Sequence, residues 1–181
     1  MSYSEERCRE FASIGAGHAA TALAKLFGCT VMMEPPRCWR VKVAELSDNI
    51  DDPENWAAVI FVSLSGAVVG RAGLLLSRAV VDEILLRLVG MDPLGEIDER
   101  ARSALSETGN IALSAVAGAL GELQRGIVIP TVPLLRLDVP QALVLEDSRP
   151  GHGQLPAYLA ETVLTERGGP LRIRVIWIPA D

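Results

Sequence analysis

The chain has 181 residues, of which 49% are hydrophobic and 22% are charged, and its formal net charge is −6. This composition is typical of a folded domain and argues against intrinsic disorder. The acidic balance disfavours a nucleic-acid-binding protein, because such proteins need clustered Lys and Arg to neutralise phosphates.

The sequence also bears on the cellular compartment. Its apolar stretches fall short of the ~20 residues that a transmembrane helix needs, and residues 1–9 have mixed charges where a secretory signal would be apolar. The three cysteines, Cys8, Cys29 and Cys38, lack the spacing of a metal site and are an odd number. We expect a cytoplasmic protein with reduced thiols and without membrane insertion.

The first half of the chain is predicted to contain two helices and two pairs of strands. Apolar residues recur every three or four positions from Ser4 to Phe27, which predicts a long helix ended by Gly28. Further elements are expected in the order extended 30–33, extended 39–46, polar loop 47–55, hairpin strands 59–64 and 69–76, and helix 78–89.

The second half repeats this order after a turn at Asp92-Pro93. Asp98 is a suitable N-cap for a second long helix that runs to about Gln124. The expected elements after it are extended segments 127–129 and 134–139, a Gly/Pro-rich loop 149–156, and strands 158–165 and 171–178 joined through Gly168-Gly169.

An internal repeat relates the two halves. A shift of 97 positions superimposes identical residues from both long helices and from the segments after them: Glu10 on Glu107, Ile14 on Ile111, Leu23 on Leu120, Val31 on Val128 and Pro36 on Pro133. Residues 1–181 are therefore predicted to form one α+β domain with pseudo-two-fold symmetry, whose halves span about 4–90 and 96–181. We expect a mainly antiparallel sheet with the two long helices packed on one face.

A polar stripe on the second long helix is the candidate site. Ser103, Glu107, Asn110 and Ser114 are spaced by four, three and four residues, so they share one helix face. The opposite face is apolar and is predicted to pack on the sheet. Solvated helix faces commonly carry such residues, so the spacing alone leaves a purely structural interpretation open.

Glycines and one histidine lie on the same helices. Gly109, Gly118 and Gly121 each cost about 1 kcal/mol relative to Ala inside a helix, which predicts that a strand or partner backbone approaches them closely. His18 lies in the same predicted helix as Gly15 and Gly17. Gly15-x-Gly17 resembles part of a dinucleotide fingerprint, but that motif needs a preceding strand and the residues before it are predicted to be helical.

A carboxylate and a carboxamide on one face can position a water molecule. The carboxylate can hold a lysine of a partner, and the amide can both donate to and accept from one water. Orientation of water is the role that a glutamine has in GTPases, and orientation alone can lower a barrier by several kcal/mol. An acyl phosphate, being labile, is a suitable substrate for such a site.

Two segments resemble a known family. The segment from Leu105 to Ile111, Leu-Ser-Glu-Thr-Gly-Asn-Ile, is similar to the E-x-G-N-I core of the CheC/CheX/FliY phosphatases, whose pattern is [DS]-x3-E-x2-N. The segment from Ile14 to Leu23 is similar to the one that follows the first copy of that pattern in CheC. With the repeat and the order of elements, the resemblance covers nearly the whole chain.

The resemblance implies a function and a role for each residue. Family members remove phosphate from the aspartyl phosphate of the regulator CheY, whose own site holds the Mg²⁺, and no cofactor is expected in this chain. Glu107 would dock on the regulator and Asn110 would orient the attacking water, with Ser103 as a supporting residue. The resemblance also places His18 on the packing side of the first helix. CheD is a further possible partner; the sequence leaves open the oligomeric state and the identity of the regulator.

The first copy of the pattern is degenerate. Glu6 and Glu10 keep the carboxylates, but Ser13 stands where asparagine is expected. A hydroxyl is shorter than the amide and lacks its paired donor and acceptor groups. This copy is predicted to be silent or strongly weakened.

Two alternatives remain open at this point. The chain could be a binding module of the same fold, either a CheD partner or a FliM-like component of the flagellar switch. The intact Glu107 and Asn110 disfavour the FliM-like role, since both copies are degenerate in FliM-type domains. The chain could also act on a receiver outside chemotaxis.

Overall fold

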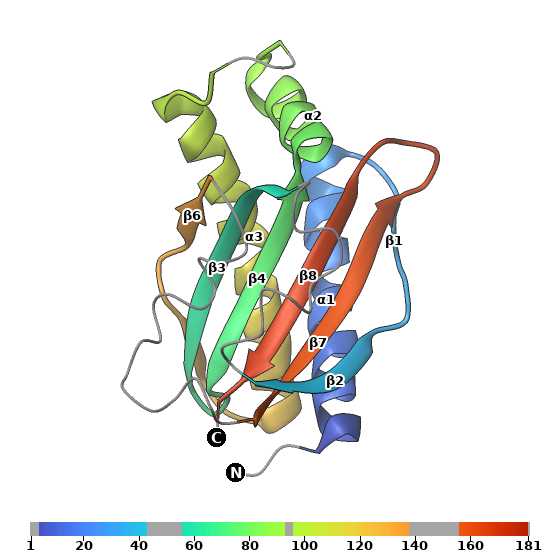
Figure 1. Ribbon diagram of the computed structural model, residues 1–181, viewed down its shortest axis with the longest axis vertical. Helices are drawn as coiled ribbons and strands as arrows, with labels where there is room; N and C mark the ends of the chain where they lie inside the picture. Colours follow the sequence, from blue (N-terminus) through green and yellow to red (C-terminus); the bar gives the residue numbers. More distant parts are fainter. Residues whose placement is uncertain (1–3, 43–55, 93–95, 138–155, 181) are drawn as a thin grey trace.

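In the residues that the structure describes, three helices and eight strands make up the fold (Figure 1). This computed structural model describes residues 4–42, 56–92, 96–137 and 156–180. In chain order the elements are α1 (Glu5–Phe27), β1 (Val31–Met33), β2 (Arg37–Lys42), β3 (Trp56–Gly66), β4 (Gly70–Ser77), α2 (Arg78–Val89), α3 (Glu99–Gln124), β5 (Val128–Pro130), β6 (Leu134–Arg136), β7 (Pro156–Glu166) and β8 (Arg172–Pro179).

Capping residues define the helix ends close to where the sequence placed them. Ser4 and Asp98 accept hydrogen bonds from the backbone N–H groups three residues on, at 3.2 and 2.8 Å. Gly28 ends α1 in the left-handed conformation (φ 65°), which a glycine adopts without strain. Helix α3 ends instead at Arg125, a non-glycine residue with φ 50°.

The strands form one antiparallel sheet in the order β1-β7-β8-β4-β3-β5, with β2 also paired to β7 and β6 to β3. The hairpins β3–β4 and β7–β8 therefore meet at the centre through β4 and β8. The predicted strands 39–46 and 134–139 correspond to β2 and β6, and these segments are described as far as residues 42 and 137. The predicted loop 47–55 and nearly all of the loop 149–156 lie outside the described residues.

The short strands of each half pair with the hairpin of the other half. Val31 of β1 lies opposite Glu166, and Val128 of β5 lies opposite Gly66. These pairs are equivalent under the repeat, because β1 and β5 differ by 97 positions whereas β3 and β7 differ by 100. The pseudo-two-fold arrangement is thus visible in the strand register, and the exchange of strands joins both halves in one sheet.

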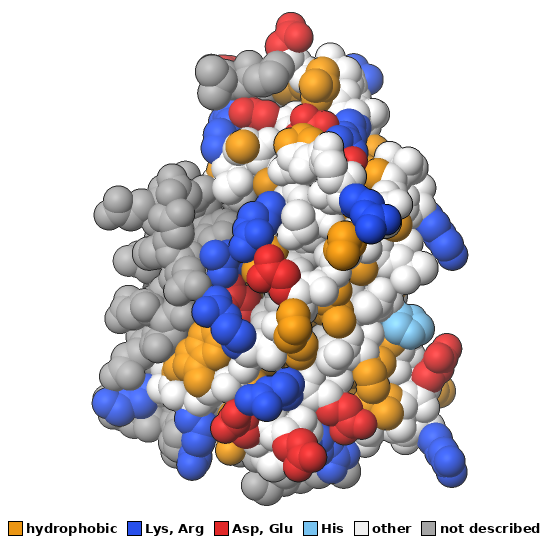
Figure 2. Space-filling view, turned by 90° about the vertical axis from the view of Figure 1, so that its right-hand side faces the viewer, with side chains coloured by type: hydrophobic (Ala, Val, Ile, Leu, Met, Phe, Trp, Pro, Cys, Tyr) orange, Lys and Arg blue, Asp and Glu red, His pale blue; other side chains and the backbone are white. Residues whose placement is uncertain are grey.

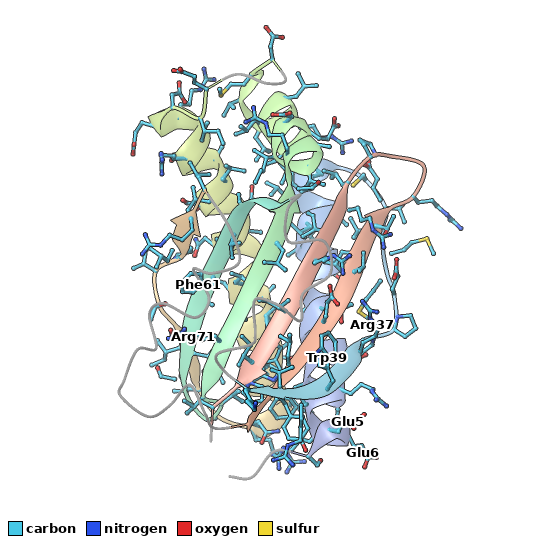
Figure 3. The ribbon with its side chains drawn as sticks, viewed as in Figure 1. Glu5, Glu6, Arg37, Trp39, Phe61 and Arg71 are labelled. Carbon is cyan, nitrogen blue, oxygen red and sulfur yellow. The ribbon has the colours of Figure 1, made fainter. Side chains whose placement is uncertain are left out.

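Helices α1 and α3 cover one face of the sheet and bury the larger core. Strand β3 shows the alternation that this requires, since Ile60 and Val62 point into this core while Val59 and Phe61 belong to a smaller cluster on the other face. Figure 3 shows Phe61 on β3 and Trp39 on β2, the strand that pairs antiparallel with β7. The predicted layer architecture is confirmed.

Helix α2 is joined to β7 by charged side chains. Arg87 donates to both carboxylate oxygens of Glu166 at 3.0 Å each, and also to Glu83 at 2.6 Å. Arg87 thereby lowers the pKa of the Glu166 carboxyl below its ordinary value, more than burial raises it. The paired carboxylates in turn raise the pKa of Arg87.

The edge formed by β1, β2 and β7 carries interspersed cations and anions (Figure 2). Arg37 pairs with the buried Glu161 at 2.9 Å, and Arg172 pairs with Glu34 at 3.1 Å. Mixed charges of this kind protect an exposed sheet edge from pairing with other chains. In the described part of the chain, every helix is too short or too polar to cross a membrane.

Candidate functional site

Helix α3 presents the predicted polar stripe to solvent. Ser103, Glu107, Asn110 and Ser114 are all exposed. The opposite face of the helix is fully buried, with Leu105, Ala112 and Leu113 each at 0% exposure. Because the buried face of α3 packs on the sheet, the four polar side chains point away from the sheet toward solvent.

A chain of hydrogen bonds orders the centre of the stripe. The Asn110 amide donates through Nδ2 to Glu107 Oε2 at 3.3 Å, and the Ser114 hydroxyl donates to Asn110 Oδ1 at 3.5 Å. Both bonds are long and exposed, so each contributes little to stability. In this arrangement the donor of the amide faces Glu107 and its acceptor faces Ser114.

The two serines of the stripe differ in their contact with Asn110. Ser103 lies one turn before Glu107, and within the described ranges its side chain makes no hydrogen bond. Ser114 lies one turn after Asn110 and contacts it directly. The i, i+4 spacing already placed Ser114 on the stripe, but the family pattern ends at the asparagine and therefore does not include it.

The degenerate copy lies at the other end of the helix pair. Helices α1 and α3 run antiparallel (Figure 1), with Arg7 Nη2 donating to Gln124 Oε1 at 2.8 Å. Figure 3 shows Glu6 at the N-terminal end of α1, remote from the start of α3. The two copies are therefore separate surfaces and do not form one composite site.

Exposure also differs between the two copies. Glu6 and Glu10 are exposed, as Glu107 is, but Ser13 is half-buried whereas its counterpart Asn110 is exposed. A short hydroxyl that is partly covered by its surroundings extends less far toward a partner than the amide of Asn110. This difference agrees with the prediction of a weak first copy.

Two of the three helix glycines are in close contact with other parts of the fold. A Cβ at position 109 would lie 2.2 Å from Ile60 Cγ2 of β3, and one at position 121 would lie 2.8 Å from the carbonyl oxygen of Gly126. Gly109 therefore lets α3 lie against the sheet beside Asn110. At position 118 a Cβ would meet no atom within 4 Å, so the described part of the chain brings no strand close to that glycine.

The position of His18 that the family resemblance implied is wrong. It is exposed and lines a groove of about 570 Å³ between α1 and α3, instead of packing inside. The buried face of α1 is made by residues on either side of it, including Ala16, Ala19 and Ala20. The signal that was missed is the polar spacing of His18, Thr21 and Lys25, at three and four residues, which marks an exposed helix face.

The cysteines come together in a way that the sequence did not predict. Cys8 of α1 and Cys38 of β2 are both buried free thiols, and they contact each other. Burial is the main cause that raises the pKa of each thiol, so neither is a reactive thiolate. In the described ranges, no three His, Cys, Asp or Glu side chains converge as ligands for a metal ion.

Comparison with known proteins identifies a family and a relative that match parts of this chain. Residues 9–38 match the CheC-like family. The CheY-P phosphatase CheC of Bacillus subtilis is 32% identical over 143 residues, which are 76% of this chain and 68% of that protein.

Solved structures share the fold. FliY of Thermotoga maritima has a TM-score of 0.73 at 19% identity, over 97% of this chain and 91% of that chain. The CheX chain in the CheX-CheY-BeF3-Mg complex of Borrelia burgdorferi has a TM-score of 0.62 at 14% identity, over 95% and 99%. At these identities the likeness concerns the fold alone, whereas the B. subtilis relative also shares sequence over most of its length. The chain therefore belongs to the CheC-like family.

Proposed function

We propose that this protein hydrolyses the aspartyl phosphate of a CheY-like receiver domain. The observation that carries the proposal is the exposed, hydrogen-bonded series Glu107, Asn110 and Ser114 on one face of α3. Further support comes from the B. subtilis relative, which is named as a CheY-P phosphatase. The complex of the CheX fold with CheY supports the choice of partner.

In the proposed mechanism the chain positions the receiver and the attacking water, and it does not act as a strong acid or base. Glu107 pairs with a lysine of the receiver and so leaves its long bond to Asn110. The freed Nδ2 and the Oδ1 of Asn110 then hold one water in line with the phosphoryl group. The water oxygen forms a bond to phosphorus, the bond to the aspartate oxygen breaks, and the water proton leaves with inorganic phosphate or passes to solvent.

Ser114 has a supporting part in this scheme. Its hydroxyl donates to Asn110 Oδ1 and so limits rotation of the amide while Glu107 is engaged elsewhere. The Mg²⁺ that offsets the phosphoryl charge is assigned to the receiver and not to this chain. The buried opposite face of α3 keeps the helix fixed while the partner docks.

The test is the decay of a phosphorylated receiver with and without the protein. Asn110→Ala should reduce kcat about 100-fold, the usual loss when one positioned polar group is removed. Glu107→Gln should mainly raise KM, because it removes the docking charge. Ser103→Ala, on the same face but without a contact to Asn110, is the matched control and should change either constant less than Ser114→Ala does.

Three results would count against the proposal or a part of it. Unchanged decay in the presence of the wild-type protein would exclude phosphatase activity toward that receiver. Tight binding of the receiver without acceleration would instead favour the binding-module alternative. Equal rates for wild type and Asn110→Ala would remove Asn110 from the mechanism while leaving the activity to another group.

A further inference from the structure

A groove between α1 and α3 hollows the helix face of the molecule. It has a volume of about 570 Å³ and an apolar floor with a polar rim. Ala22, Leu26, Ile111 and Ala115 make the floor, and His18, Thr21 and Lys25 make the rim. A hollow of this size can accept one or two side chains of a partner protein.

The groove is continuous with the candidate site. Ile111 directly follows Asn110, and Ala115 directly follows Ser114. Successive residues of an α-helix are about 100° apart, so the groove borders the polar stripe along its length. A partner that contacts Asn110 therefore covers this groove as well.

The groove beside Asn110 carries a positive charge, whereas the equivalent surface in the other half of the repeat carries a negative one. A shift of 97 positions takes Thr21 to Gly118, Leu26 to Leu123 and Lys25 to Glu122. The floor residue is retained, but the cation is replaced by an anion beside the degenerate copy. Both Lys25 and Glu122 are exposed, so each charge is accessible to a partner protein.

We propose that this groove recognises the receiver itself, by binding an apolar side chain that has a carboxylate next to it, close to the phosphorylated aspartate. The inference rests on the proposed function, because the occupant is the partner that Asn110 acts upon. The apolar floor accepts the hydrophobic side chain, and Lys25 at the rim pairs with the carboxylate. The groove thus selects the receiver and directs it to α3 instead of to the equivalent surface beside Ser13.

Binding of a receiver from the source organism, loaded with beryllofluoride and Mg²⁺, tests this inference without requiring turnover. Lys25→Glu should raise Kd about tenfold and weaken its dependence on salt, since a like charge then meets the carboxylate. Thr21→Trp should raise Kd at least as much by filling the groove. The matched controls are Glu122→Lys and Gly118→Trp, at the equivalent positions of the other half, and both should bind within about twofold of wild type.

A turnover measurement separates this inference from the proposed function. Lys25→Glu should raise KM and leave kcat at saturating receiver unchanged, whereas Asn110→Ala should lower kcat. If Lys25→Glu and Thr21→Trp bind as tightly as wild type while Asn110→Ala is inactive, the groove has no part in recognition and the phosphatase assignment stands. If wild type binds the receiver through the groove but does not accelerate its decay, the proposed activity fails and the docking surface stands. Wild type that does not bind the loaded receiver overturns the groove inference.

Discussion

Gly109→Ala should destabilise the protein although it improves the helix propensity of α3. The new methyl group would lie 2.2 Å from Ile60 Cγ2, about 1.3 Å short of an ordinary carbon–carbon contact. Ile60 is fully buried on β3, so it has little room to move. Overpacking of this kind costs about 1 to 3 kcal/mol, and we take the upper end because the contact is so short.

The helix gains about 1 kcal/mol from the loss of glycine, so the free energy of unfolding should fall by about 2 kcal/mol. For a domain of this size that corresponds to a melting temperature lower by about 4 to 8 °C. Gly118→Ala on the same helix is the control, because its new methyl group meets no atom of the described residues within 4 Å. That variant should gain about 1 kcal/mol.

Urea unfolding measures the stability of both variants. Both gain the same helix propensity, so the difference between them reports the packing cost at position 109. The double variant Gly109→Ala with Ile60→Ala should lose less stability than the sum of the two single variants, since the clash is absent once Cγ2 is removed. A Gly109→Ala protein as stable as Gly118→Ala would refute the close approach of α3 to β3. Because Asn110 adjoins Gly109, the same displacement should also lower phosphatase kcat.

Three further predictions concern the degenerate copy, a charged pair and a helix cap. Glu10→Ala should leave the dephosphorylation rate within about twofold of wild type, because Ser13 lacks the amide; a large loss would show that the first copy is active. Glu166 has a pKa lowered by Arg87, so its contribution to stability is complete at neutral pH and is lost as pH falls below about 4.5 through the lower folded-state pKa. Glu166→Gln should therefore flatten the acid limb of stability measured by thermal unfolding between pH 3 and 7, and an unchanged limb would contradict this linkage. Asp98→Ala removes the 2.8 Å bond to the Ala101 N–H and should cost about 1 kcal/mol, visible in denaturant unfolding, whereas Asp98→Asn should retain most of the stability.

Local features of the sequence were sufficient to predict the two long helices and the polar stripe on α3. The 3.6-residue periodicity, with Asp98 and Gly28 as end signals, located α1 and α3 to within a residue. The same periodicity placed Glu107 and Asn110 on one exposed face, because helix geometry alone relates residues three apart. The 97-residue repeat correctly indicated a pseudo-symmetric fold.

Contacts between distant segments had to come from the tertiary structure. The exchange of short strands between the halves depends on pairing between residues about 60 to 135 positions apart, for which β1 and β5 carry only three residues of local pattern each. The roles of Gly109 and Gly118, which have the same propensity, differ only in what lies opposite them.

The sequence by itself therefore determined which residues share a helix face and which copy of the pattern keeps its amide. Both depend on the identity of residues within two helical turns, where spacing is fixed by backbone geometry. The tertiary structure decided that α1 and α3 run antiparallel, that the two copies lie at opposite ends, and that the groove with Lys25 borders the intact copy. These features arise from packing between helices, which a local pattern does not encode.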